Sequence, residues 1–277
     1  MFVGFLTTPF ADRPLDAVLD FAQAASIRAL EIHAAPGTGH IDPLRMDRAE
    51  ARRLRTEIES RDLVVSALAW YTGDLLLPKK TKETQGLICK LIDAAAALGV
   101  DTVCLLAGFD DGGRGKLAVI ERDLPGAWKP ILKHATKRKT RIAIENYHKT
   151  VLQGVDTIDA LFEAIPHEAL GLNYDPSHLV HQGCDHLETL RRHSERIFHV
   201  HAKDCFVDHT LRSRVGIYGS GWWRYVLPGS GKIQWGEFIS QLRAIGYTGV
   251  LSIEHEDRFQ ELEEGFRRAA WHLEQYC

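Results

Sequence analysis

Two glutamates, an aspartate and a histidine end four consecutive apolar runs in the second half of the chain. These residues are Glu145, Asp175, His201 and Glu254. Three carboxylates and one imidazole form a mostly oxygen donor set, which suits Mn²⁺, Mg²⁺ or Co²⁺ better than structural zinc. Carboxylates crowded together repel one another unless a cation neutralises them. Each residue alone is as well explained as an ion pair or polar cap, but four matching positions favour a shared metal site.

The runs that carry these residues belong to a longer rhythm. Short apolar or β-branched runs alternate with segments of helical period, which is typical of repeated βα units and a parallel sheet. The expected strands are residues 2–6, 29–33, 64–68, 102–106, 141–145, 171–175, 197–201 and 250–254. Eight units predict an α/β protein that closes into a (β/α)₈ TIM barrel. A chain of 277 residues agrees with a single domain over residues 1–277.

Alternation along each expected strand indicates which side chains face the barrel interior. Ile142 and Ile144 form the apolar set of the fifth strand, which places Glu145 inside. The same reading places Asp175 and His201 inside on the next two strands. Barrels of this kind hold their chemistry at the C-terminal ends of the strands. The ligands are therefore expected to converge at the barrel mouth.

Two polar residues close to these ligands are candidates for contact with a substrate. His178 follows Asp175 by three residues, and we expect it to touch the outer shell of the metal or a substrate hydroxyl; capping of the next segment is the alternative. Lys203 lies two residues beyond His201 at inward parity. It is expected to hold a substrate oxygen or stabilise an enolate, and the alternative is a solvated loop lysine.

Further candidates line the expected mouth less directly. His33 ends the second strand at inward parity after the equally inward Glu31, and a buried hydrogen-bonded pair is the other interpretation. Four aromatic residues could form a wall for the apolar face of a sugar ring, although packing is the more common role of an aromatic side chain. They are Trp70, Tyr147, Trp222 and Trp223.

One long irregular stretch, residues 205–232, is rich in glycine and holds two of these tryptophans. A loop of this length inside a compact domain is usually functional, so we expect a lid or a substrate wall. A surface excursion with its own aromatic cluster is the alternative.

Composition excludes several classes of protein. The net charge of −3 leaves no basic footprint for nucleic acid. No apolar run approaches the ~20 residues that cross a bilayer, and the start lacks the basic flank of a signal peptide. Five scattered cysteines argue against a disulfide framework. We therefore expect a cytoplasmic protein with free thiols, no nucleic-acid or membrane partner and a small sugar-like substrate; a homo-oligomer is left open.

The segments around these candidate residues resemble the motifs of a known superfamily, the xylose-isomerase-like barrels of sugar phosphate isomerases and epimerases. Tagatose and psicose epimerases, inosose dehydratase and endonuclease IV are related to it. The resemblance covers essentially the whole chain, and the order and spacing of its motifs carry it. The motifs are Ile-Ala-Ile-Glu145-Asn, Asn-Tyr-Asp175-Pro-Ser-His178, His-Val-His201-Ala-Lys-Asp204, Pro228-Gly-Ser-Gly-Lys-Ile-Gln-Trp235 and Leu-Ser-Ile-Glu254-His-Glu.

The resemblance implies one Mn²⁺-type ion on Glu145, Asp175, His201 and Glu254, with Mg²⁺, Co²⁺ and Zn²⁺ as alternatives. It also implies that the two glutamates serve as acid and base. The leading interpretation is a metal-dependent isomerase or epimerase of a sugar or sugar derivative, which transfers a proton through a metal-stabilised enediolate. A metal-dependent lyase or dehydratase acting on a keto sugar or keto-glycoside is one alternative. A non-catalytic sugar-binding or partner subunit is another.

Endonuclease IV is the relative that the sequence argues against. Its trinuclear zinc cluster needs histidines at the ends of the third and fourth strands. This chain has Ala67-Leu-Ala-Trp70 and Leu105-Leu-Ala-Gly108 there. DNA repair is therefore not expected.

Overall fold

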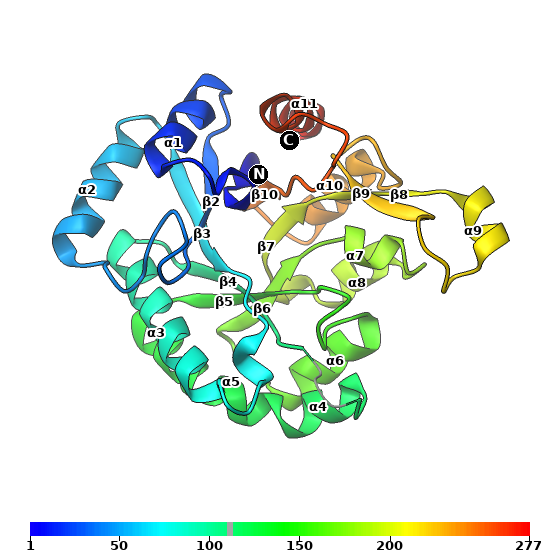
Figure 1. Ribbon diagram of the computed structural model, residues 1–277, viewed down its shortest axis with the longest axis horizontal. Coiled ribbons are helices and arrows are strands. Elements are labelled where there is room, and N and C mark those ends of the chain that lie inside the picture. The colour runs from blue at the N-terminus through cyan, green and yellow to red at the C-terminus, as the bar shows by residue number, and fades with distance from the viewer. Residues whose placement is uncertain (110–112) are drawn as a thin grey trace.

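A closed barrel of eight parallel strands forms the centre of the molecule in the computed structural model, which describes residues 1–109 and 113–277 (Figure 1). Around the barrel the strands follow the order β1-β10-β7-β6-β5-β4-β3-β2. The strands are β1 (Phe2–Leu6), β2 (Ala29–His33), β3 (Val64–Trp70), β4 (Thr102–Leu106), β5 (Arg141–Glu145), β6 (Leu170–Tyr174), β7 (Ile197–Ala202) and β10 (Val250–Ile253). The predicted α/β barrel and all eight of its strands are confirmed, with ends that shift by one or two residues.

Helices surround the barrel and cover the outward faces of its strands (Figure 1). They are α1 (Leu15–Ala24), α2 (Arg48–Glu59), α3 (Thr81–Leu98), α4 (Lys116–Arg122), α5 (Leu124–Arg138), α6 (Val155–Ala164), α7 (Ser177–Val180), α8 (His186–Arg192), α10 (Trp235–Ala244) and α11 (Leu262–Glu274), with 3₁₀ turns at Thr8–Phe10, Asp74–Leu76 and Ser194–Arg196. The last helix, α11, packs beside β1, so the two ends of the chain meet where the barrel closes. Within the described ranges no helix is both long and apolar enough to cross a membrane.

The barrel interior is divided between small apolar and polar side chains. The apolar cluster comes from β1, β3, β4 and β5, and four of its five members, all but Leu6, have small side chains. Its members are Leu6, Ala67, Ala69, Cys104 and Ala143. The buried polar residues come from β2, β6, β7 and β10, and they include Glu31, Asn173, His199, His201 and Ser252. Small side chains on one side leave room for the polar network on the other.

The stretch predicted as an irregular loop contains regular structure. Strands β8 (Asp204–Val207) and β9 (Trp223–Val226) pair antiparallel, and helix α9 (His209–Val215) lies between them. This hairpin projects sideways from the barrel, as the yellow segment of Figure 1 shows. Cys205, Val207 and Trp222 form a small buried cluster within it. The hairpin therefore has a small packed cluster of its own, and Trp223 and Tyr225 of β9 also contact His181 and His178. A role as a lid or substrate wall stays a prediction.

Candidate metal centre

The four predicted ligands meet at the C-terminal ends of their strands. Glu145 ends β5 and His201 lies in β7, whereas Asp175 and Glu254 directly follow β6 and β10. Each residue offers one ligand atom, and these four atoms all lie within 4.8 Å of one another. Asp175 and His201 are fully buried. Inward parity thus brings together residues that are up to 109 positions apart in the sequence.

His201 turns one ring nitrogen toward the carboxylates and the other away from them. Its Nδ1 lies 3.0 Å from Glu254 Oε2 and 3.3 Å from Glu145 Oε1. Its Nε2 lies 3.0 Å from Glu31 Oε2. A metal-ligating histidine commonly donates its second ring N–H to a carboxylate, which fixes the tautomer and the ring orientation. His201 has the contacts that such a ligand requires.

Glu31 is the buried support of this histidine. Ser252 Oγ donates to Glu31 Oε2 at 2.7 Å, and the Tyr71 hydroxyl donates to Oε1. Burial alone would raise the pKa of Glu31, but His201 and His199 outweigh it and hold this pKa at about 2. Glu31 therefore stays ionised and keeps its orientation toward His201.

Two atoms of the centre are buried without a hydrogen bond to any described residue. They are His201 Nδ1 and Asp175 Oδ2, although Glu254 Oε2 lies 3.0 Å from the former and Lys203 Nζ 3.1 Å from the latter. Such orphaned acceptors are costly unless another partner binds them. Burial lowers the pKa of His201, yet Glu31 and Glu254 raise it well above its usual range. The donor set, its orphaned atoms and its excess of negative charge fit a divalent cation.

Lys203 lies inside the cluster of carboxylates. Only 1% of its side chain is exposed, and Nζ lies 2.6 Å from Glu254 Oε2. Glu256 Oε1 is 3.7 Å from the same ammonium group. Burial raises the pKa of Glu254, but Lys203 and His201 lower it to about 2. The structure excludes the solvated loop lysine, and a contact with substrate stays a prediction.

His178 lies beside the centre, in the outer position that the sequence predicted. Its Nε2 is 3.1 Å from Glu145 Oε1 and 3.4 Å from Asp175 Oδ2. Tyr147 packs against it, with ring centroids 4.9 Å apart. Both predicted residues are thus close to the ligands, and their contact with a substrate stays a prediction.

Trp70 requires a correction. It packs with the core on the outer side of β3, whereas its neighbour Tyr71 packs with the interior cluster that contains Ala67 and Ala69. Alternate residues of a strand face opposite sides, so the parity of Ala67 and Ala69 points Tyr71 and not Trp70 inward. Tyr71 is a residue that sequence reasoning missed. Its hydroxyl lies 3.0 Å from His201 Nε2.

His33 is half-buried at the end of β2, and its Nδ1 has no hydrogen-bond partner among the described residues. Its backbone N–H donates to Thr7 Oγ1 at 2.9 Å. Burial, with His40 nearby, lowers the pKa of His33. The buried pair suggested for Glu31 forms instead with His201, and the substrate contact of His33 stays a prediction.

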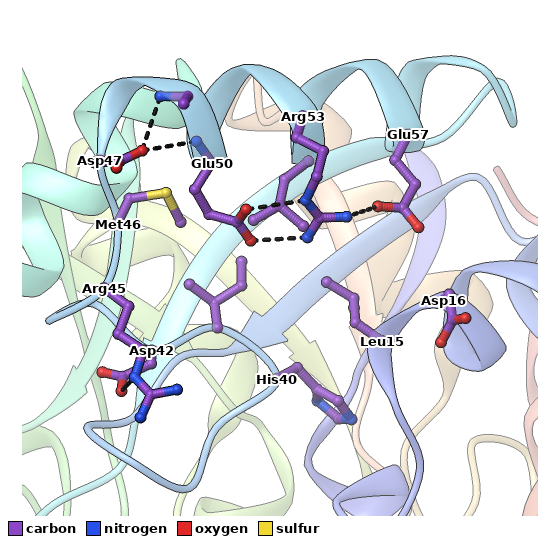
Figure 2. A pocket seen from close by; sticks show the side chains of 13 residues that line it. Leu15, Asp16, His40, Asp42, Arg45, Met46, Asp47, Glu50, Arg53 and Glu57 are labelled. Atoms are coloured by element: carbon purple, nitrogen blue, oxygen red, sulfur yellow. Dashed lines mark hydrogen bonds and ion pairs between the residues drawn. The ribbon is translucent and has the colours of Figure 1, made fainter.

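A groove of about 700 Å³ lies elsewhere, between the start of α1, the segment before α2 and α2 itself (Figure 2). Arg53 lies along the α2 side of this groove and contacts Glu50 and Glu57 of the same helix, both at 2.7 Å. Asp47 accepts hydrogen bonds from the first turn of α2. The groove contains none of the four ligands, and its charged groups largely satisfy one another. We therefore place the candidate active site at the barrel mouth.

Comparison with known proteins agrees with this fold. The chain belongs to the xylose isomerase-like TIM barrel family, whose model matches residues 19–276. Among curated proteins it is similar to YfiH of Bacillus subtilis, an uncharacterised protein, with 26% identity and 99% of both chains covered. It is also similar to inosose dehydratase of Clostridium perfringens, with 25% identity over 75% of this chain and 74% of that enzyme.

Solved structures share the same fold. A xylose isomerase-like barrel from Mycobacterium smegmatis in complex with magnesium superposes with a TM-score of 0.79 at 15% identity, covering 99% of this chain and 95% of the other. The 3-keto-D-glucoside 4-epimerase YcjR of E. coli gives a TM-score of 0.76 at 15% identity, with 99% of both chains covered. At such identities the likeness concerns the fold.

Proposed function

We propose that this protein is a divalent-metal-dependent isomerase or epimerase that transfers a proton beside the carbonyl of a sugar or sugar derivative. The observation that carries the proposal is the convergence of three carboxylates and His201 Nδ1 within 4.8 Å at the barrel mouth. Inosose dehydratase is a relative of this chain and 3-keto-D-glucoside 4-epimerase shares its fold, which supports this class of substrate.

The metal would be held by Glu145, Asp175, His201 and Glu254. Because the donor set is rich in oxygen, we propose Mn²⁺ first, with Mg²⁺, Co²⁺ and Zn²⁺ as alternatives. The M. smegmatis barrel binds magnesium and the barrel of the IOLI protein binds zinc, which supports a divalent ion. When bound, such an ion supplies Lewis-acid polarisation of a carbonyl and a neighbouring hydroxyl.

The residues around this position would move the proton. Glu145 and Glu254 are the proposed acid and base. Burial raises the pKa of both, but His178 and His201 lower that of Glu145, and Lys203 and His201 lower that of Glu254. Each carboxylate is therefore able to accept the proton that it later returns. Lys203 is placed to donate a hydrogen bond to an oxygen on which negative charge develops. His178 is proposed to bind a substrate hydroxyl, and Tyr147 to pack beside the substrate.

Dehydration is the second candidate, and a specific observation favours it. The similarity to inosose dehydratase extends over three quarters of this chain. The two reactions begin with the same proton abstraction, but a dehydratase must also protonate the departing hydroxyl. A buried ammonium group such as that of Lys203 could supply that proton, so the site is compatible with either outcome.

The two reactions are separated by incubating metal-loaded protein in D₂O with a panel of keto sugars and ketocyclitols. An isomerase or epimerase should place deuterium on a single carbon without other change in composition, whereas a dehydratase should release water and give an unsaturated product. Glu145→Gln and Glu254→Gln should slow exchange by ~10²–10⁴, the usual contribution of general acid–base catalysis. Binding without exchange or turnover across the panel would favour the sugar-binding subunit and contradict the proposal.

A further inference from the structure

Three histidines gather next to the carboxylate centre but are not among its four ligands. His148 follows β5, whereas His178 and His181 lie in α7 and directly after it. Each offers one ring nitrogen, and the three nitrogens lie within 4.8 Å of one another. His178 and His181 are buried, and His148 is half-buried. The proposed proton transfer does not use His148 or His181.

The spacing of these nitrogens differs from that of ordinary hydrogen bonds. His148 Nδ1 lies 3.4 Å from His178 Nδ1 and 3.3 Å from His181 Nε2. An N–H hydrogen bond is usually about 2.9–3.0 Å long. In a tetrahedral zinc site with Zn–N bonds of about 2.0–2.1 Å, two ligand nitrogens are about 3.3–3.4 Å apart. The two histidine distances match an edge of that tetrahedron.

The protonation of the three rings suits metal binding. His178 Nε2 lies 3.1 Å from Glu145 Oε1, so a proton on Nε2 leaves Nδ1 as an acceptor on the side of His148 and the Tyr225 hydroxyl. Burial is the main cause that lowers the pKa of His148 to about 3 and that of His181 to about 4. Neutral imidazole is the form that binds a metal ion.

The projecting hairpin supplies the walls of this cluster. Trp223 of β9 stacks on the His181 ring, with centroids 3.9 Å apart and planes within 4° of parallel. The Tyr225 hydroxyl lies 2.7 Å from His178 Nδ1 and 3.3 Å from His148 Nδ1. Stacking fixes one ring. The Tyr225 hydroxyl contacts the other two rings, so an ion bound there would replace its hydrogen bond to His178 Nδ1 or take the phenol oxygen as a further ligand.

We infer that His148, His178 and His181 form a second metal site, which takes Zn²⁺. Three imidazole nitrogens select a borderline ion such as zinc, whereas the oxygen-rich centre selects harder ions. His178 would connect the two sites, because its Nε2 faces Glu145 and its Nδ1 faces the second ion. This inference does not depend on the proposed proton transfer, but with the ion bound His178 would have no ring nitrogen left for the substrate hydroxyl that was proposed above.

The test is zinc stoichiometry after removal of metals with a chelator. Wild-type protein should bind two Zn²⁺ per chain, whereas Asp175→Ala should retain only the histidine-bound ion. Adding His148→Gln or His181→Gln to Asp175→Ala should weaken that remaining binding by roughly a hundredfold or more, since even an outer-shell partner of a metal ligand is worth about 10–100-fold. Calorimetric titration and elemental analysis give both quantities without an assay of activity.

Co²⁺ provides a spectroscopic readout of the same ion. Bound to Asp175→Ala, it should give the intense visible absorption of a four-coordinate, nitrogen-rich site, and His181→Gln should abolish that absorption. His134→Gln is the matched control, because His134 is partly buried and pairs with Asp93 outside either centre. Circular dichroism verifies that each variant is folded. Equal zinc affinity in folded Asp175→Ala with and without His148→Gln or His181→Gln would overturn the second site.

Discussion

Lys203 Nζ lies 2.6 Å from Glu254 Oε2, with both side chains withdrawn from solvent at the mouth of the barrel. The same ammonium group is 3.1 Å from Asp175 Oδ2. A buried ion pair of this kind contributes little net stability when complete, but leaves an uncompensated charge when one partner is removed. Replacing Lys203 should therefore change both the net charge of the centre and the reaction that the centre supports.

Lys203→Met should separate metal binding from turnover. Removing the positive charge increases the attraction between the carboxylates and a divalent cation, so the Kd for Mn²⁺ should fall. If Lys203 contacts the substrate, kcat should fall by about 10²-fold, the lower range for the loss of one stabilising donor. Metal titration and steady-state kinetics on one preparation measure the Kd and kcat. An unchanged kcat would show that Lys203 only balances the charge of the carboxylates and does not contact the substrate.

His201→Ala and Asp175→Ala should each lose the ion of the carboxylate centre and all activity while the barrel remains folded. The reason is that each substitution removes a ligand atom that no neighbouring residue replaces. Elemental analysis of Mn²⁺-loaded protein and far-ultraviolet circular dichroism give the two readouts. Full Mn²⁺ occupancy in both variants would show that the ion binds somewhere other than the carboxylate centre.

Glu31→Gln tests whether the Glu31 carboxylate strengthens metal binding by His201. The substitution preserves size but removes the negative charge 3.0 Å from His201 Nε2. We expect Mn²⁺ affinity to fall by about 10–100-fold, as for other partners of a ligating histidine. Glu57→Gln, a carboxylate of α2 remote from the barrel interior, is the control. Equal affinities in Glu31→Gln and the wild type would leave Glu31 without influence on the metal.

Asp204→Asn should destabilise the fold more than an ordinary surface change. The Asp204 carboxylate accepts bonds from the indole of Trp235 and from four backbone N–H groups, those of Cys205, Gly229, Gly231 and Ile233. An amide nitrogen in place of one oxygen would face donors, so the free energy of unfolding should fall by about 3 kcal/mol or more. Urea denaturation measures it. Asp208→Asn is the control and should change the free energy of unfolding much less, because Asp208 only caps α9 and asparagine caps a helix about as well as aspartate.

His40 should make stability fall in acid. Burial lowers the pKa of His40 from 6.5, so between that lowered pKa and 6.5 the unfolded chain binds more protons than the folded one. Its contribution to stability is therefore present above pH 6.5 and is lost as the pH falls below it. Urea denaturation from pH 7.5 to 5 should give a shallower dependence for His40→Gln than for the wild type. The control is His209→Gln, at an exposed position; identical slopes for His40→Gln and the wild type would contradict the prediction.

Strand parity explains why much of the barrel and the carboxylate centre could be predicted. Glu145 and His201 end strands whose alternation shows directly which side faces inward. Trp70 was placed wrongly because the expected third strand ended before it, and Tyr71 was not considered. The packing of Ala67 and Ala69 in the interior shows the correct side.

The histidine cluster could not be predicted in the same way. His148 lies in a loop and His181 at the end of a helix of one turn, so neither follows a period that assigns it a direction. Tyr225 reaches them only because β8 and β9 pair, and the glycine-rich composition of that stretch predicted a loop. Contacts made by tertiary structure alone leave no local pattern in the sequence.

The hydrogen bond from Ser252 to Glu31 spans 221 positions of the chain. Contacts of such long range form late, because the entropy of closing the loop must be lost before they bring any gain. The support of His201 is therefore complete only when the last strand of the barrel joins the first. A nascent chain still lacking β10 would have neither Ser252 nor Glu254, so selective loading of the carboxylate centre must follow the synthesis of β10.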